Sequence, residues 1–221
     1  MAEVLITLGI IGIVAALTMP VLIANHNKKV VETRLKKFYS IINQAIKMSE
    51  VENGDRIFWY QDAGGLETDE NGDPIEGTSV ILTWYNKYLS KYLQVVNIET
   101  DEGGNPTFYL ADGSAFECDN QHDAMRDWVF YPINPKRCIN KQKNGINVTG
   151  KCAFRFLYCP TCYGKEWTYT GKNFEPYKYN WDNRYESLFN RCKEGDGAFC
   201  TALIQYNNWL IPKNYPLRVG N

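Results

Sequence analysis

The segment that decides the fold is KKVVETRLKKFYSIINQAIKMSE, residues 28–50. Its apolar and small residues recur at alternating spacings of four and three, the pattern of one face of an α-helix. No turn signal separates this segment from the residues before it, so the sequence predicts one long helix that ends near Asn53-Gly54. The predicted buried face consists of Val31, Leu35, Phe38, Ile42, Ala45 and Ser49.

An apolar run precedes this face, from Val4 to Ala24. Its 21 residues carry no charge. At about 1.5 Å per residue they would span roughly 30 Å, the thickness of a bilayer's hydrocarbon core. A cleaved secretory signal would instead show a basic leading region and a small-residue cleavage site. The sequence thus predicts a single membrane crossing, although Glu3 precedes it and Pro20 interrupts it.

Charge is distributed unevenly along the chain, although the net charge is only -1. Residues 1–49 carry 6 basic and 2 acidic side chains, residues 50–125 carry 3 and 16, and residues 126–193 carry 13 and 5. Such asymmetry favours electrostatic contact, either between two parts of one domain or between neighbouring copies.

The chain contains seven cysteines, which indicates an oxidising compartment for the folded part. Cys192 and Cys200 flank a short glycine-containing loop and are predicted to form a disulfide. The odd count leaves one cysteine unpaired or bonded to another chain. The pairing of the other five stays open: Cys118, Cys138, Cys152, Cys159 and Cys162.

The Cys159-Pro-Thr-Cys162 motif allows three interpretations. Outside the cytoplasm, structural disulfides are the common fate of such cysteines, and we favour them. A zinc site would need four ligands, which Cys138 and Cys152 would complete. A thiol redox centre would need a βαβ context that the sequence does not show.

The remainder of the chain predicts an α+β domain. A second amphipathic helix is expected over 80–97, capped by Thr78 or Ser79, followed by a hairpin over 107–118. Further strands are expected over 127–133, 151–159, 165–171 and 201–211. The acidic stretch 61–77 is predicted to be a solvated turn rather than a calcium site, because its glycine spacing does not fit an EF-hand. The phrases LETDENGDP and IETDEGGNP are predicted to be similar turns.

Glu3 followed by V-L-I-T-L-G-I-I-G-I-V-A-A-L-T-M-P resembles the amino-terminal segment of type IV pilins and type II secretion pseudopilins. The tail C-K-E-G-D-G-A-F-C-T-A-L-I-Q-Y-N-N-W-L-I-P is similar to that of a pilin-like group. The resemblance implies that the family's basic leader and first two mature residues are not in the sequence as given.

The implied fold is pilin-like α+β, with one long amino-terminal helix packed on a small antiparallel sheet and a second short helix. The helix would span the membrane in its first half and be amphipathic in its second. The expected divisions are a transmembrane or filament-core segment at 1–24, an amphipathic continuation at 25–53, and an extracytoplasmic α+β domain at 54–221.

The resemblance also implies a function, that of a structural subunit that polymerises from the inner membrane through its amino-terminal helix. Glu3 would pair with the amino end of a neighbouring subunit, and Pro20 would loosen the helix during assembly. The implied location is the bacterial inner membrane, single-pass with the folded part extracytoplasmic, and afterwards a filament. Implied partners are other copies or related pilins, the prepilin peptidase, the inner-membrane assembly machinery, and the lipid bilayer before assembly.

An alternative function is a membrane-tethered extracellular binding module, such as an adhesin or a DNA-uptake minor pilin. It would use residues 126–193, in which basic residues alternate with 15 aromatic residues. Nucleic acid is not the favoured partner, because the same composition suits a sheet core with a basic face. The chain is not predicted to be an enzyme, and neither a metal nor a cofactor is predicted.

Overall fold

The computed structural model of the chain describes residues 2–59, 64–118, 126–160 and 174–220, with residues 2–12, 15 and 126 described by their backbone only. Its largest element is helix α1, Ala2–Asn53. The helix is 52 residues long, which corresponds to about 80 Å. It ends where the sequence predicts, because Gly54 takes a φ of +74°, the left-handed conformation that terminates helices.

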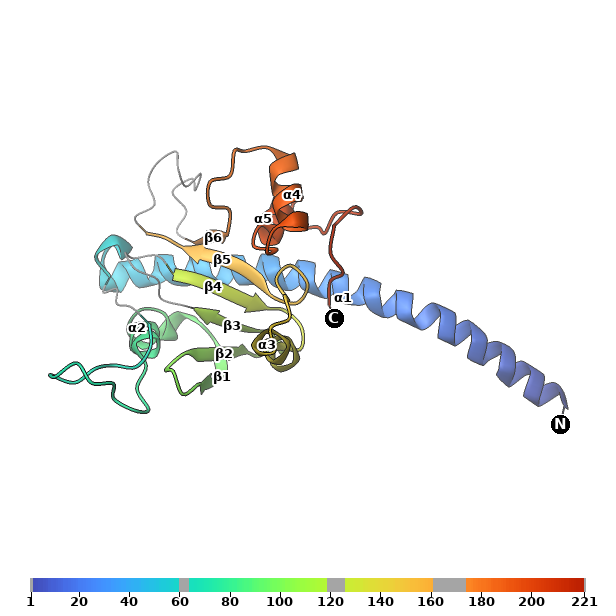
Figure 1. Cartoon of the computed structure of the whole chain (residues 1–221), viewed down its shortest axis with the longest axis horizontal. Coiled ribbons are helices and arrows are strands. Elements are labelled where there is room, and N and C mark those ends of the chain that lie inside the picture. Colours follow the sequence, from blue (N-terminus) through green and yellow to red (C-terminus); the bar gives the residue numbers. More distant parts are fainter. Residues whose placement is uncertain (1, 60–63, 119–125, 161–173, 221) are drawn as a thin grey trace.

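The predicted buried face of α1 is confirmed. All six of its residues are at most 1% exposed, so the spacings of four and three identify the side of the helix that faces the domain. Before Val31 no described residue of α1 is buried. The first half of the helix therefore extends away from the domain, as Figure 1 shows.

A single antiparallel sheet of six strands lies against α1, with neighbouring strands also adjacent in sequence. Strands β2 and β3 form the predicted hairpin, and β3 pairs with β4 so that Phe116 lies opposite Phe130. The strands are β1 Val95–Thr100, β2 Pro106–Leu110, β3 Ala115–Cys118, β4 Arg126–Tyr131, β5 Phe154–Tyr158 and β6 Phe174–Pro176.

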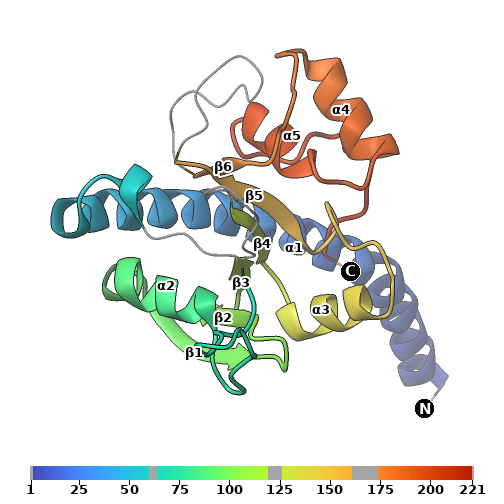
Figure 2. The same ribbon diagram turned by 60° about the vertical axis from the view of Figure 1, so that its left-hand side comes forward.

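Four shorter helices and two 3-10 turns complete the part of the fold that the structure describes. Helix α2 packs beside α1 against the same sheet face, where Tyr85 contacts Phe108. Helix α3 covers the opposite face, and α4 with α5 flanks the β6 edge (Figure 2). The elements are η1 Arg56–Phe58, α2 Val80–Tyr88, η2 Ser90–Tyr92, α3 Pro135–Lys143, α4 Tyr185–Glu194 and α5 Cys200–Tyr206.

Two predicted elements are corrected by the structure. The second helix, capped by Ser79 as expected, ends at Tyr88, and the β-branched residues after it form β1 instead. The strand predicted over 201–211 is wrong, because its apolar part belongs to helix α5. The strand predicted over 165–171 lies outside the described residues.

The predicted fold class is also corrected. The sheet has six strands rather than being small, and four shorter described helices accompany α1 where one is predicted. Within the ranges that the structure describes, no helix combines the length and hydropathy needed to cross a bilayer. The predictions of a membrane-spanning first half and of a single-pass inner-membrane location are therefore wrong. These predictions rest on the uncharged apolar run from Val4 to Ala24 and on the resemblance to pilins.

Candidate functional site

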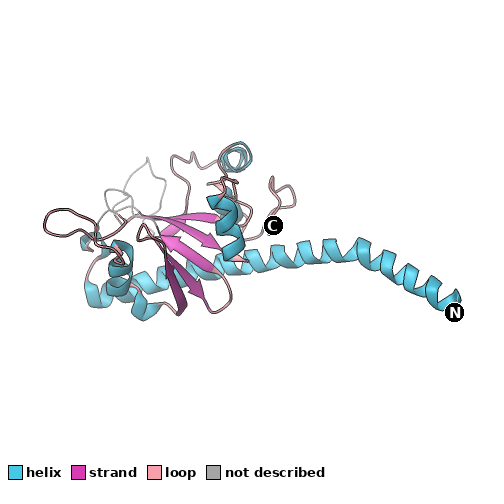
Figure 3. Cartoon of the chain, turned by 60° about the horizontal axis from the view of Figure 1, so that its bottom comes forward, coloured by secondary structure: helices cyan, strands magenta, loops and turns pink. Residues whose placement is uncertain are grey.

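The projecting half of α1, residues 2–26, is the main candidate for a functional surface. Figures 1 and 3 show this part of the helix running free of the sheet and curving gently towards the amino end. Its described apolar side chains are exposed, with Leu17 at 72% and Leu22 at 70%. The others are Ile13, Val14, Met19, Val21 and Ile23.

These apolar residues surround the projecting half rather than lining one side of it. Successive residues of a helix are about 100° apart around its axis. Leu17 and Val21 consequently share one side, Met19 lies nearly opposite Leu17 with Ile23 beside it, and Leu22 occupies a third direction. A helix that is apolar all round is buried by partners on several sides.

Both residues that the resemblance assigns to assembly lie in this half of α1. Pro20 stands within the helix, where it cannot donate to the carbonyl of Ala16. The Thr18 hydroxyl donates to the Val14 carbonyl at 2.8 Å, so this polar side chain is satisfied within the helix. Glu3 belongs to the helix by its backbone, and its side chain lies outside the described residues.

Polar contacts fix the second half of α1 to the domain near the point where the helix leaves it. The Arg34 guanidinium donates to the carbonyls of Pro132 and Asp112. The Lys37 ammonium lies 2.9 Å from the Asp112 carboxylate, and Glu32 accepts from the amide of Ile211 at 2.8 Å. The projecting half therefore extends from a firmly held base.

A buried polar network joins α1 to β6 and α5. Glu175, at 3% exposure, accepts from the Tyr39 hydroxyl at 3.1 Å and from the Gln205 amide at 3.2 Å. The Lys178 ammonium lies 3.3 Å from the same carboxylate. Burial, and then the charge and hydrogen bond of Glu175, raises the pKa of Tyr39 above its usual range.

Replacing Lys178 with methionine should lower the free energy of unfolding by roughly 3 kcal/mol, because a buried carboxylate loses its cationic partner. The measurement is urea unfolding at neutral pH. The double variant Lys178→Met with Glu175→Gln should recover part of the loss, since it removes the uncompensated charge. A double variant that is less stable than the single one would contradict this account.

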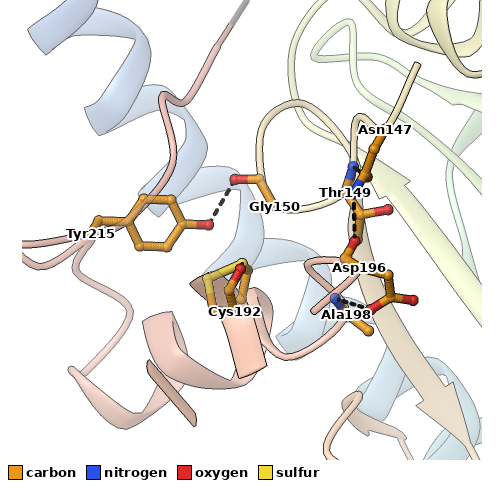
Figure 4. Close-up of a disulfide and its surroundings, with 8 residues drawn as sticks. Asn147, Thr149, Gly150, Cys192, Asp196, Ala198 and Tyr215 are labelled. Carbon is orange, nitrogen blue, oxygen red and sulfur yellow. Dashed lines mark hydrogen bonds between the residues drawn. A yellow bond between two sulfur atoms is a disulfide. The ribbon is translucent and has the colours of Figure 1, made fainter. Parts of the chain in front are cut away.

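A disulfide joins Cys192 to Cys200, as predicted, and fixes α4 to α5. The loop Val148–Ala153 packs closely on it, since a Cβ at Gly150 would lie 2.5 Å from the Cys200 sulfur. Figure 4 shows the Tyr215 hydroxyl donating to the Gly150 carbonyl at 2.7 Å beside the disulfide. The site is structural. The α4–α5 pair, the loop Val148–Ala153 and the segment around Tyr215 meet there, away from the projecting half of α1.

Other cysteines are also bonded, which weighs against the zinc interpretation. Cys138 pairs with Cys152 and links α3 to the approach of β5. Two of the four proposed zinc ligands are thereby used. Cys159 is disulfide-bonded as well, and Cys162 lies outside the described residues.

Replacing both Cys192 and Cys200 with serine should lower the free energy of unfolding by roughly 2–3 kcal/mol. Without the disulfide the unfolded chain regains the conformational entropy that closing a loop of this length removes. Urea unfolding under non-reducing conditions measures the loss. Removing both partners avoids a reactive thiol in the variant. Unchanged stability would show that the surrounding contacts alone hold α4 to α5.

A cleft of about 920 Å³ lies between α3 and the outer face of the sheet, and sequence reasoning missed it. Glu117 is in its floor, where its carboxylate accepts from the Tyr131 hydroxyl at 2.7 Å and the Thr107 hydroxyl at 2.8 Å. Lys136 of α3 closes one side through an ion pair with Glu99 at 2.7 Å. The sequence signal for this cleft is the alternation of polar residues along β2 and β3, because these polar side chains face away from the core.

Residues 126–193, the basic aromatic region, do not form one surface in the fold. Many of its aromatic side chains are buried in the core between α1 and the sheet, including Trp128, Phe130, Phe154, Phe156 and Phe174. Tyr177 and Trp181 pack partly buried against α4 and α5. Trp167 and Tyr169 lie outside the described residues. Tyr179 remains half-exposed.

Comparison with known proteins finds one family. A family model described as a family of unknown function, DUF6613, matches residues 21–219. Neither the curated proteins nor the solved structures contain a match to the chain.

Proposed function

The chain belongs to the DUF6613 family, whose function is unknown, and we propose that it is a structural subunit that assembles with further copies through the projecting half of α1. The observation that carries the proposal is the apolar surface around the described side chains of this half, from Ile13 to Ile23, exposed on every side. Exposed apolar surfaces of this kind mark interaction sites.

Copies of the same helix suit this surface better than a single partner. A partner that covers one side would leave the opposite side in water, and a two-fold dimer has this defect. A bundle of several parallel copies buries all sides at once. The assembly we propose is therefore a multi-copy bundle with the folded domains on its outside.

The likeness of residues 3–20 to the pilin amino-terminal segment supports the same conclusion. In such an assembly Glu3 would pair with the amino end of a neighbouring copy, and Pro20 would give the helix room to adjust within the bundle. Related pilin-like chains are the other candidate neighbours. A pilus and a secretion pseudopilus are both compatible with this proposal.

The test is the self-association of the full chain. Sedimentation velocity over a concentration series should show species much larger than a dimer, and electron microscopy should show elongated particles. Stabilising salts such as sulfate should promote assembly, because they strengthen apolar burial. A monomer at all concentrations would overturn the proposal. So would flotation with neutral phosphatidylcholine vesicles in the absence of self-association, since the surface would then bind lipid.

A further inference from the structure

One end of the domain carries a hairpin whose charged residues are all acidic. Residues 64–78 contain five carboxylates and neither lysine nor arginine. Four of them are exposed, namely Asp69, Glu70, Asp73 and Glu76. None of these four makes an ion pair within the described part of the chain.

The tip of this acidic hairpin has a defined shape. The Asp69 carboxylate accepts from the amides of Asn71 at 2.8 Å and Asp73 at 2.9 Å, and Thr68 pairs with Pro74 across the base. The same arrangement recurs at Asp101, which accepts from Gly103 and Asn105, so the two predicted similar turns are alike in structure. Asp69 shapes the turn, and Glu70 and Asp73 are left to face a partner.

Helix α3 provides a surface of the opposite sign. Its nine residues include Lys136, Arg137, Lys141 and Lys143 and no acid. Lys136 is paired with Glu99. Arg137, Lys141 and Lys143 form no ion pair with any residue that the structure describes, and we call these three the basic α3 residues.

The two surfaces lie towards opposite ends of the domain along α1. In Figure 1 the acidic hairpin extends beyond the end where α1 terminates, and α3 lies on the side where α1 leaves the domain. The Gly104 turn holds the hairpin base there, since a Cβ at Gly104 would be 2.7 Å from the Gly65 backbone. Parallel copies displaced along α1 therefore bring the hairpin of one copy to α3 of the next.

We propose that the acidic hairpin of one copy docks on the basic α3 residues of the next copy, in a head-to-tail contact. This inference rests on the proposed function, because it needs copies already aligned by their projecting helices. In a head-to-tail stack, one end still presents an unbound hairpin and the other an unbound α3. Further copies can therefore add at both ends, and the stack does not close. Charge complementarity of this kind sets register and suppresses wrong alignments.

Charge reversal tests the contact. One variant carries Glu70→Lys and Asp73→Lys, and the other carries Arg137→Glu and Lys141→Glu; none of these side chains makes a described hydrogen bond. Each variant alone should need at least about tenfold more protein to assemble at 50 mM salt, because like charges then face each other at the substituted positions of every junction. An equimolar mixture of the two should recover assembly, since the lysines of one hairpin then face the glutamates of the other copy's α3, and the unchanged hairpin meets the unchanged α3.

The control is Lys193→Glu with Lys213→Glu, two exposed lysines away from both surfaces, which should assemble like the wild type. Circular dichroism verifies that each variant is folded. If either variant alone assembles normally, or if the mixture stays unassembled, the head-to-tail contact is overturned. The proposed function would still stand in that case, provided that the wild type assembles. Assembly of the wild type that requires calcium and stops with a chelator would also overturn it, because the hairpin would then bind a cation.

Discussion

The variant that carries Leu17→Asp and Leu22→Asp is expected to remain monomeric under conditions in which the wild type assembles. Both side chains are about 70% exposed in the single chain and lie about 140° apart around α1. Burying a leucine contributes roughly 1.5–3 kcal/mol. Losing two of them costs roughly 3–6 kcal/mol per subunit, or about 10²- to 10⁴-fold in affinity. The aspartates add the cost of placing charge in an apolar bundle.

The matched control uses the same helix and the same substitution at its other end. Met48→Asp with Val51→Asp also replaces two exposed apolar residues of α1, of which Val51 is 86% exposed. This variant should assemble as the wild type does, because these residues lie beyond the projecting half. Sedimentation velocity compares the three proteins. Equal loss of assembly in both variants would show that added charge, rather than the projecting surface, decides the result.

The two contributions to assembly should respond to salt in opposite directions. Apolar burial by the projecting halves is strengthened by sulfate, and docking of the acidic hairpin on α3 is weakened by screening. With sodium chloride, which mainly screens, the wild type should lose the advantage that it has over the charge-reversed variants at low salt. This difference separates the bundle from the head-to-tail contact in one series of measurements.

Sequence periodicity predicts the buried face of α1 because a helix against a flat sheet buries one continuous stripe. Each of the six predicted residues meets this condition. The β2–β3 hairpin and strands β4 and β5 can also be predicted from the sequence, because alternating side chains and turn residues are local signals. The disulfide between Cys192 and Cys200 follows from its short loop.

Other features depend on contacts that a single sequence does not display. The apolar run of α5 is buried on all sides by α4, β5 and the segment around Tyr215, and a short buried run suits a strand as well as a helix. The membrane crossing is predicted from the uncharged apolar run Val4–Ala24, and no described helix meets the length and hydropathy of a crossing. The cleft under α3 arises because Cys138 and Cys152 bring α3 back over the sheet, and the pairing of these cysteines was open.

Replacing Phe38 with alanine is expected to lower the free energy of unfolding by roughly 4 kcal/mol. Its ring is 1% exposed and stacks on Phe130 with 4.1 Å between centroids. Four further rings contact it from β3 to β6, at centroid distances of 5.4, 6.3, 5.4 and 5.6 Å, namely Phe116, Trp128, Phe156 and Phe174.

The loss should be large because the site cannot collapse: the surrounding rings are held by four different strands, and a cavity in such a frame stays open. Urea unfolding should be measured in the Leu17→Asp, Leu22→Asp background, since self-association would otherwise add to apparent stability. Phe58→Ala is the control; its ring is 82% exposed, and its effect should stay within about 0.5 kcal/mol. A loss below about 1 kcal/mol for Phe38→Ala would mean that this ring does not join α1 to the sheet. The domain would then lack the firm base from which the projecting half assembles.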